Sequence, residues 1–121
     1  MYEPEEILNA TEVIFPILPK LLDATTAAQL QQQLQQFIIT QDIESIWQAL
    51  DQYPQTRHWR SKYLEQSVAN RSGSQLDGDM VAQPSGLIYA CPHCDYRDVV
   101  FFIGMNPDSC PNHPDAVLYR I

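Results

Sequence analysis

Apolar residues recur at helical spacing through the first 70 residues of the chain. The clearest stripe repeats at i, i+4, i+7 and i+8 and contains Leu30, Leu34, Phe37 and Ile38. Glutamines fill much of the opposite face, as on a solvated helix surface, and Thr25 or Thr26 is expected to cap its start. Similar patterns occupy residues 5–15, 42–52 and 56–72. With short loops between them, these segments predict a helical bundle over residues 1–71.

Prolines set the expected ends of the helices. Pro16 and Pro19 should end or break the first helix, and Pro54 should close the third, because proline lacks a backbone donor and clashes with the preceding turn.

Turn-forming residues then replace the helical pattern, and residues 72–86 are predicted to be a linker. Beyond residue 86, apolar and β-branched runs predict strands at residues 87–90, 98–103 and 116–121. The expected fold class is therefore α+β, with a helical bundle followed by a three-stranded antiparallel sheet over residues 87–121.

Residues 99–103 are apolar at five successive positions, so both faces of the predicted strand are apolar. Alternation places Val99, Phe101 and Ile103 on one face and Val100 and Phe102 on the other. A small sheet has one core, so one face must cover the helices or a partner chain. We expect the first set to line the sheet's own core and Phe102 to lie on the docking side.

Two short pairs of metal-ligand residues flank the middle strand. Cys91 and Cys94 form one pair, Cys110 and His113 form the other, and each pair has two residues between its members. Three clustered cysteines, an odd number, do not form a disulfide framework. Nitrogen and sulfur donors in this spacing predict one structural Zn²⁺ held by Cys91, Cys94, Cys110 and His113.

Three alternatives compete with this assignment. His93 is a rival nitrogen ligand, but it lies inside a turn whose two cysteines already share a metal. Cys-Pro-His-Cys also matches a thioredoxin-like redox motif, yet strands rather than a large helical domain follow it. A catalytic zinc would keep an open position, and no glutamate lies in residues 71–121 to act as a general base.

Residues 87–121 resemble a zinc ribbon with rubredoxin-type knuckles, in which Cys-Pro-x-Cys turns sit on adjacent hairpins. Both Cys-Pro steps fit this family. Asp95 and Pro114 depart from it, because they follow the second ligand of each turn where a knuckle usually has glycine. Since the φ angle of proline is locked near −65°, the second turn is expected to differ in geometry.

Charge narrows the possible functions. The chain carries 7 Lys and Arg against 15 Asp and Glu, for a formal charge of −8, which disfavours nucleic acid as a partner. No apolar run is long enough to span a membrane, and the acidic N-terminus is unlike a signal peptide, so a cytoplasmic location is expected.

Motifs of known enzymes are absent from the sequence, and we predict no catalytic residues. His58 has no nucleophile beside it in sequence and is expected to be an exposed helix residue. The sequence favours a zinc-stabilised protein–protein interaction module, an adaptor or accessory subunit of a larger cytoplasmic assembly. A nucleic-acid-binding zinc ribbon is one alternative, and a subunit of an enzyme whose active site lies on another chain is a second.

Overall fold

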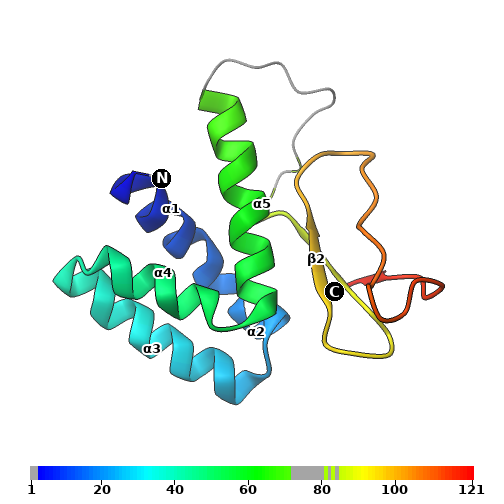
Figure 1. Ribbon diagram of the computed structural model, residues 1–121, viewed down its shortest axis with the longest axis horizontal. Coiled ribbons are helices and arrows are strands. Elements are labelled where there is room, and N and C mark those ends of the chain that lie inside the picture. The colour runs from blue at the N-terminus through cyan, green and yellow to red at the C-terminus, as the bar shows by residue number, and fades with distance from the viewer. Residues whose placement is uncertain (1–2, 72–80, 82, 84) are drawn as a thin grey trace.

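The computed structural model describes residues 3–71, 81, 83 and 85–121. Its helices come first in the chain and its strands last, which confirms the α+β class (Figure 1). The helices are α1 (Pro4–Ile14), α2 (Leu18–Leu21), α3 (Ala24–Thr40), α4 (Ile43–Asp51) and α5 (Pro54–Arg71), with a 3-10 turn η1 (Phe15–Ile17) after α1. The four predicted helices correspond to α1, α3, α4 and α5. The proline-rich stretch between α1 and α3 forms η1 and the short α2.

Aspartates rather than threonines cap the two central helices. The Asp23 carboxylate accepts a hydrogen bond of 3.1 Å from the backbone N–H of Thr26, so Asp23 caps α3 where Thr25 or Thr26 was expected. Asp42 caps α4 in the same way, accepting from the backbone N–H of Ser45 at 3.2 Å. A carboxylate is favourable at this position because it satisfies a free N–H and complements the helix dipole.

One apolar core lies among the helices and extends to the sheet. Its fully buried side chains include Ile14, Leu18, Leu30, Leu34, Ile46, Leu50, Trp59 and Leu64. Ile88, Val99 and Phe101 of the C-terminal part belong to the same cluster. Helix α5 provides the junction, because it packs on α4 on one side and lies against β2 on the other (Figure 1).

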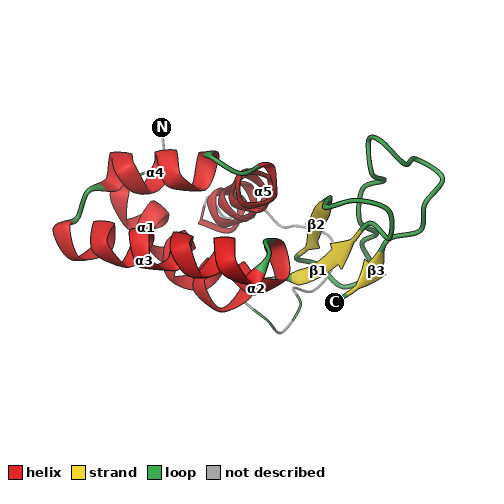
Figure 2. Cartoon of the chain, turned by 90° about the horizontal axis from the view of Figure 1, so that it is seen from below, coloured by secondary structure: helices red, strands yellow, loops and turns green. Residues whose placement is uncertain are grey.

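The three strands form one antiparallel sheet, as predicted, and their order is β2-β1-β3 (Figure 2). They are β1 (Leu87–Ala90), β2 (Arg97–Val100) and β3 (Tyr119–Arg120). The first matches its predicted range, whereas β2 ends at Val100 and β3 has two residues. Residues 101–118 form loops and turns, so contacts other than strand pairing must hold them in place.

The apolar run 99–103 docks on the helices by the face opposite to the one expected. Phe101 lies against Trp59 and Tyr63 of α5, with ring centroids 6.3 and 5.9 Å apart. Val99 joins the same core, whereas Phe102 is only partly buried and Ile103 is 66% exposed. The assignment of Val99 and Phe101 to the sheet's own core was therefore wrong. The alternation also stops at Ile103, because the chain turns there.

Most of the predicted linker, residues 72–86, lies outside the described residues, and the boundaries of the predicted units stay predictions. Its described end is tied to the core, since the Trp59 indole N–H donates to the Ser85 carbonyl at 2.9 Å. Gly86 has a φ angle of 79°, and a Cβ atom there would lie 2.5 Å from Val99 Cγ2. Glycine is therefore required where the chain enters β1 so close to β2.

Candidate metal centre

The four predicted ligands meet at the end of the sheet where β1 leads into β2, near the start of α5. Cys91 directly follows β1, Cys94 lies in the turn between β1 and β2, and Cys110 and His113 bracket a turn in the C-terminal loop. Their donor atoms all lie within 4.8 Å of one another. The hairpin turn closes because the Cys91 N–H donates to the Tyr96 carbonyl at 3.1 Å, and the His113 N–H closes the second turn on the Cys110 carbonyl at 3.1 Å.

The distances between donor atoms suit one tetrahedral metal ion. Cys94 Sγ and Cys110 Sγ are 3.4 Å apart, and His113 Nδ1 lies 3.6 Å from Cys110 Sγ and 3.7 Å from Cys91 Sγ. With zinc–sulfur bonds of ~2.3 Å and zinc–nitrogen bonds of ~2.0 Å, a regular tetrahedron has edges of roughly 3.5–3.8 Å. The residues present could therefore hold a metal ion with little rearrangement.

The thiols influence one another, as expected of a cation site. Burial alone would raise the pKa of Cys110, but hydrogen bonds from His113, the Asn112 backbone and Cys94 outweigh it and lower this pKa to about 6. The pKa of Cys94 is raised instead: the Tyr96 backbone acts to lower it, but burial and the thiols of Cys110 and Cys91 outweigh this. Adjacent thiolates repel one another, so a bound dication would favour deprotonation of the whole set.

His93, the rival ligand, lies outside this group of donors. Its side chain is exposed, with the ring centroid 5.2 Å from that of His113. Its backbone N–H instead donates to Cys91 Sγ at 3.4 Å, a contact that orients the sulfur. Among the described non-glycine residues, Gln41 alone has a positive φ angle, so neither Asp95 nor Pro114 adopts the left-handed conformation usual for a knuckle.

A second cluster, which the sequence analysis missed, lies between α5 and the sheet. We call it the Asp98 cluster and define it as His58, Lys62, Asp98 and Asp108. Lys62 Nζ donates to Asp98 Oδ1 at 2.7 Å and to Asp108 Oδ2 at 3.1 Å. His58 Nε2 lies 2.7 Å from Asp98 Oδ1, so His58 is half-buried and paired rather than simply exposed.

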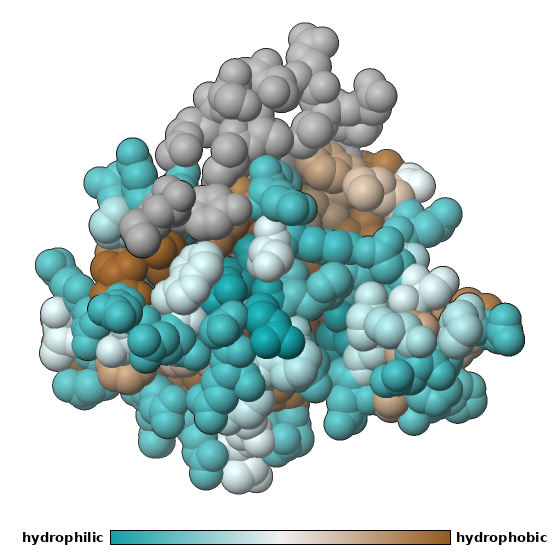
Figure 3. Space-filling view, viewed as in Figure 1, coloured by the Kyte–Doolittle hydropathy of each residue, from teal (hydrophilic) through white to brown (hydrophobic). Residues whose placement is uncertain are grey.

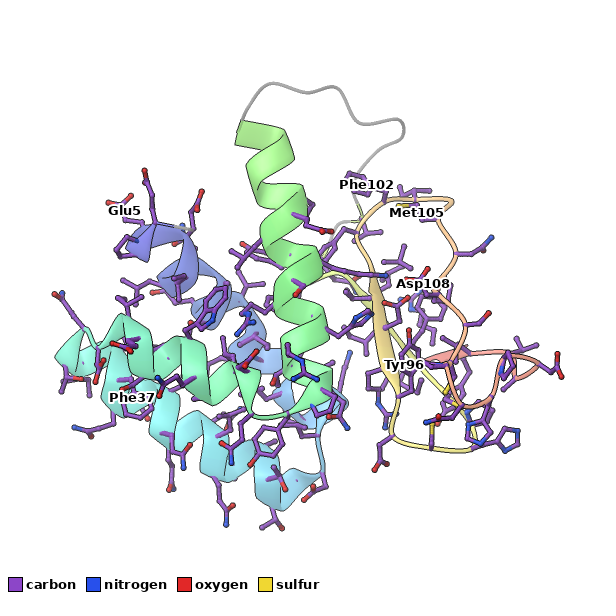
Figure 4. All side chains as sticks on the ribbon, viewed as in Figure 1. Glu5, Phe37, Tyr96, Phe102, Met105 and Asp108 are labelled. Carbon is purple, nitrogen blue, oxygen red and sulfur yellow. The ribbon has the colours of Figure 1, made fainter. Side chains whose placement is uncertain are left out.

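Asp98 is the centre of this cluster, and its side chain is fully buried. Burial by itself would raise the pKa of Asp98, but hydrogen bonds from His58, Lys62 and the Asp108 backbone outweigh it and lower the pKa to about 2. Lys62 offsets one of the two carboxylate charges, and the donor atoms of His58, Asp98 and Asp108 lie within 4.8 Å of one another. The Asp98 cluster fastens the loop that carries Asp108 to helix α5 (Figure 4). No sequence signal links Asp98 with His58, which is 40 residues away.

Comparisons with known proteins identify no relative of this chain. No family model matches it, and neither the curated proteins nor the solved structures searched provide a match. Within the described residues, none of the helices has the length and apolar content needed to cross a membrane.

Proposed function

We propose that this protein is a protein–protein interaction module whose C-terminal part is stabilised by one structural Zn²⁺. The metal assignment rests on the donor set of three thiolates and one imidazole at tetrahedral spacing. Four protein ligands leave no open coordination position for water or substrate, which is the arrangement of structural rather than catalytic zinc. The resemblance of residues 87–121 to a zinc ribbon agrees with this role.

The observation that carries the interaction role is where the exposed apolar side chains lie. Among the described residues the large exposed ones are Ile39, Ile103, Met105, Val117 and Tyr119, and all but Ile39 belong to the C-terminal part. Figure 3 shows brown surface at the upper right, where Figure 4 labels Phe102 and Met105. Grouped exposed apolar residues on a small protein usually mark an interaction surface.

The negative net charge favours a protein over a nucleic acid as the partner. A formal charge of −8 repels phosphate backbones, so the nucleic-acid alternative lacks the electrostatic attraction on which such binding depends. Some basic side chains are already paired with acidic ones inside the fold, as Lys62 is in the Asp98 cluster. Few basic groups are therefore left for a nucleic-acid surface. We therefore propose an adaptor or accessory subunit of a cytoplasmic assembly.

A pair of matched variants tests this proposal. Ile103→Asp combined with Met105→Asp should keep zinc and thermal stability, because both side chains are exposed, yet abolish capture of partners from a lysate of the native cell. Ile39→Asp, on α3, makes the same kind of change and should capture the same proteins as the wild type. Quantitative mass spectrometry provides the readout. If the double variant captures the wild-type set, the apolar residues of the C-terminal part are not the interaction surface.

A further inference from the structure

A hollow of 650 Å³ lies between the first two turns of α5 and the turns that carry the metal ligands. Figure 3 shows the surface notched between the helical part, on the left, and the C-terminal part, on the right. Cys94 and Cys110 border the hollow on one side, and Arg57, His58 and Ser61 border it on the other. Its volume lies within the range of sites for small ligands.

The spacing of residues on α5 explains which of its side chains border this hollow. Pro54, Arg57, His58 and Ser61 stand at i, i+3, i+4 and i+7, so they share one face of the helix. Trp59, which is buried in the core, lies on the other side of the helix. Apart from Pro54, the α5 residues that border the hollow are thus polar or cationic.

Arg57 differs from the neighbouring cations of α5 in having no partner. The Arg60 guanidinium donates to the Trp47 carbonyl and to Asp51 and lies 3.7 Å above the Trp47 ring. Lys62 is held by the Asp98 cluster. Within the described part of the chain, the exposed Arg57 side chain, which borders the hollow, makes neither a hydrogen bond nor an ion pair. Its guanidinium donors are therefore free to bind a ligand in the hollow.

The remaining polar groups around the hollow favour an anion. Arg97 borders it and uses Nε and Nη1 for the carbonyls of Lys20 and Tyr96, which leaves Nη2 without a partner among the described residues. Ser61 and Asn112 can also donate, and Asp95 provides the only carboxylate of the lining. Two guanidinium groups and one carboxylate thus border the hollow, beside the proposed zinc centre, whose three thiolates would give it a net charge of −1.

We propose that this hollow binds the oxyanion group of a small ligand, a carboxylate or a phosphate, with Arg57 as its principal contact. A guanidinium matches either group because its parallel N–H donors can bond two oxygens at once. Arg97, His58 and Ser61 complete the contacts. The site is distinct from the exposed apolar residues of the proposed interaction surface and functions independently of them.

Titration of the full-length, zinc-loaded chain with two simple anions tests this proposal. Inorganic phosphate and succinate are added separately, at constant ionic strength made up with chloride, and amide shifts are followed by ¹H–¹⁵N NMR. We expect saturable shifts at residues 55–61 and 94–97 with at least one anion and none with chloride. Saturation by phosphate alone assigns a phosphate ligand, saturation by succinate alone assigns a carboxylate, and saturation by neither overturns the proposal.

Variants with equal charge changes separate a site from general attraction. Arg57→Gln should weaken binding at least about tenfold, since hydrogen bonds to charged groups are among the stronger ones. Arg120→Gln removes the same charge from β3, outside the hollow, and should bind as the wild type does. Zinc content and the remaining amide shifts show that each variant is folded. Equal weakening in both variants, or none in Arg57→Gln, overturns the site. Ile103→Asp with Met105→Asp should bind the anion normally, so failure of the interaction surface and failure of this site are separable.

Discussion

The helical part and the C-terminal part of this protein are stabilised by different means. Helices α1 to α5 bury a continuous apolar core with side chains such as Leu30, Ile46 and Trp59. Within residues 102–121, Cys110 is the one buried residue, and only Tyr119 and Arg120 form a strand. The helical part can therefore be stable through apolar burial, whereas the metal ligands and the Asp98 cluster must hold the C-terminal loops.

This difference gives a physical reason for a metal ion in the C-terminal part. Ordering one residue costs roughly 1–2 kcal/mol of backbone entropy. Residues 102–121 bury little apolar surface to offset it, mainly at the partly buried Phe102 and Ile121. A metal site supplies a large free energy from a few side chains, so it can order a segment too short to build a core. The proposed Zn²⁺ would thus stabilise the C-terminal part, as apolar packing stabilises the helices.

Loss of the metal should have the largest effect and should affect the two parts unequally. Zinc removal by a chelator, or Cys110→Ser, should abolish the dispersed NMR signals of residues 102–121, because structural zinc contributes roughly 10–16 kcal/mol of apparent binding free energy. The helical circular dichroism signal should largely remain. Native mass spectrometry should find one zinc ion per chain of the wild type. An apoprotein with unchanged NMR spectra would show that the C-terminal part does not depend on metal.

The junction between the two parts should show the next largest effect. Phe101→Ala removes a buried ring that contacts Trp59 and Tyr63, so it should lower the free energy of unfolding by about 3–5 kcal/mol. Zinc content should not change. Phe102→Ala is the matched control, and its effect should be smaller because Phe102 is only partly buried. Urea unfolding measures both. Equal effects would mean that the apolar run does not dock through the face that carries Phe101.

Asp98→Asn tests the polar attachment of the C-terminal loop and should have a smaller effect. The pKa of Asp98 is lowered from 3.8 to about 2, which corresponds to about 2 kcal/mol of stabilisation. Because the folded-state pKa is the lower one, this stabilisation is present above pH 4 and is lost as the pH falls towards 2. The difference in unfolding free energy between wild type and Asp98→Asn should decline over that window.

Metal loss at acid pH affects the wild type and Asp98→Asn alike, so comparing the two at each pH removes its contribution. A difference in stability that does not vary with pH would contradict the assigned role of the Asp98 carboxylate.

The sequence predicted the features that depend on local pattern. Helical periodicity identified the four main helices, and the spacing of Cys91, Cys94, Cys110 and His113 predicted residues that the fold does bring together. Both signals are local, because the geometry of a helix or a turn is set by residues close in sequence.

Features that depend on tertiary packing escaped prediction. The face of β2 that docks is decided by where α5 lies, since either alternating set of residues 99–103 is apolar. The pairing of His58 with Asp98 joins residues 40 apart, and each alone is typical of a solvated surface. Strand lengths were overestimated, because the apolar residues after Val100 pack on the helices or lie in turns instead of extending the ladder.

The smallest effect is expected at His93, and it separates a ligand from its neighbour within the C-terminal part. His93→Ala should leave zinc affinity nearly unchanged, because its exposed ring lies outside the donor group and its contact with Cys91 comes from the backbone N–H, which alanine keeps. His113→Ala removes a donor and should weaken zinc binding by more than the roughly 10–100-fold typical of lost outer contacts. Competition with a zinc-binding dye measures both affinities. A loss at His93 that equals or exceeds the loss at His113 would move the fourth ligand to the first turn and leave the second turn joined to the metal through Cys110 alone.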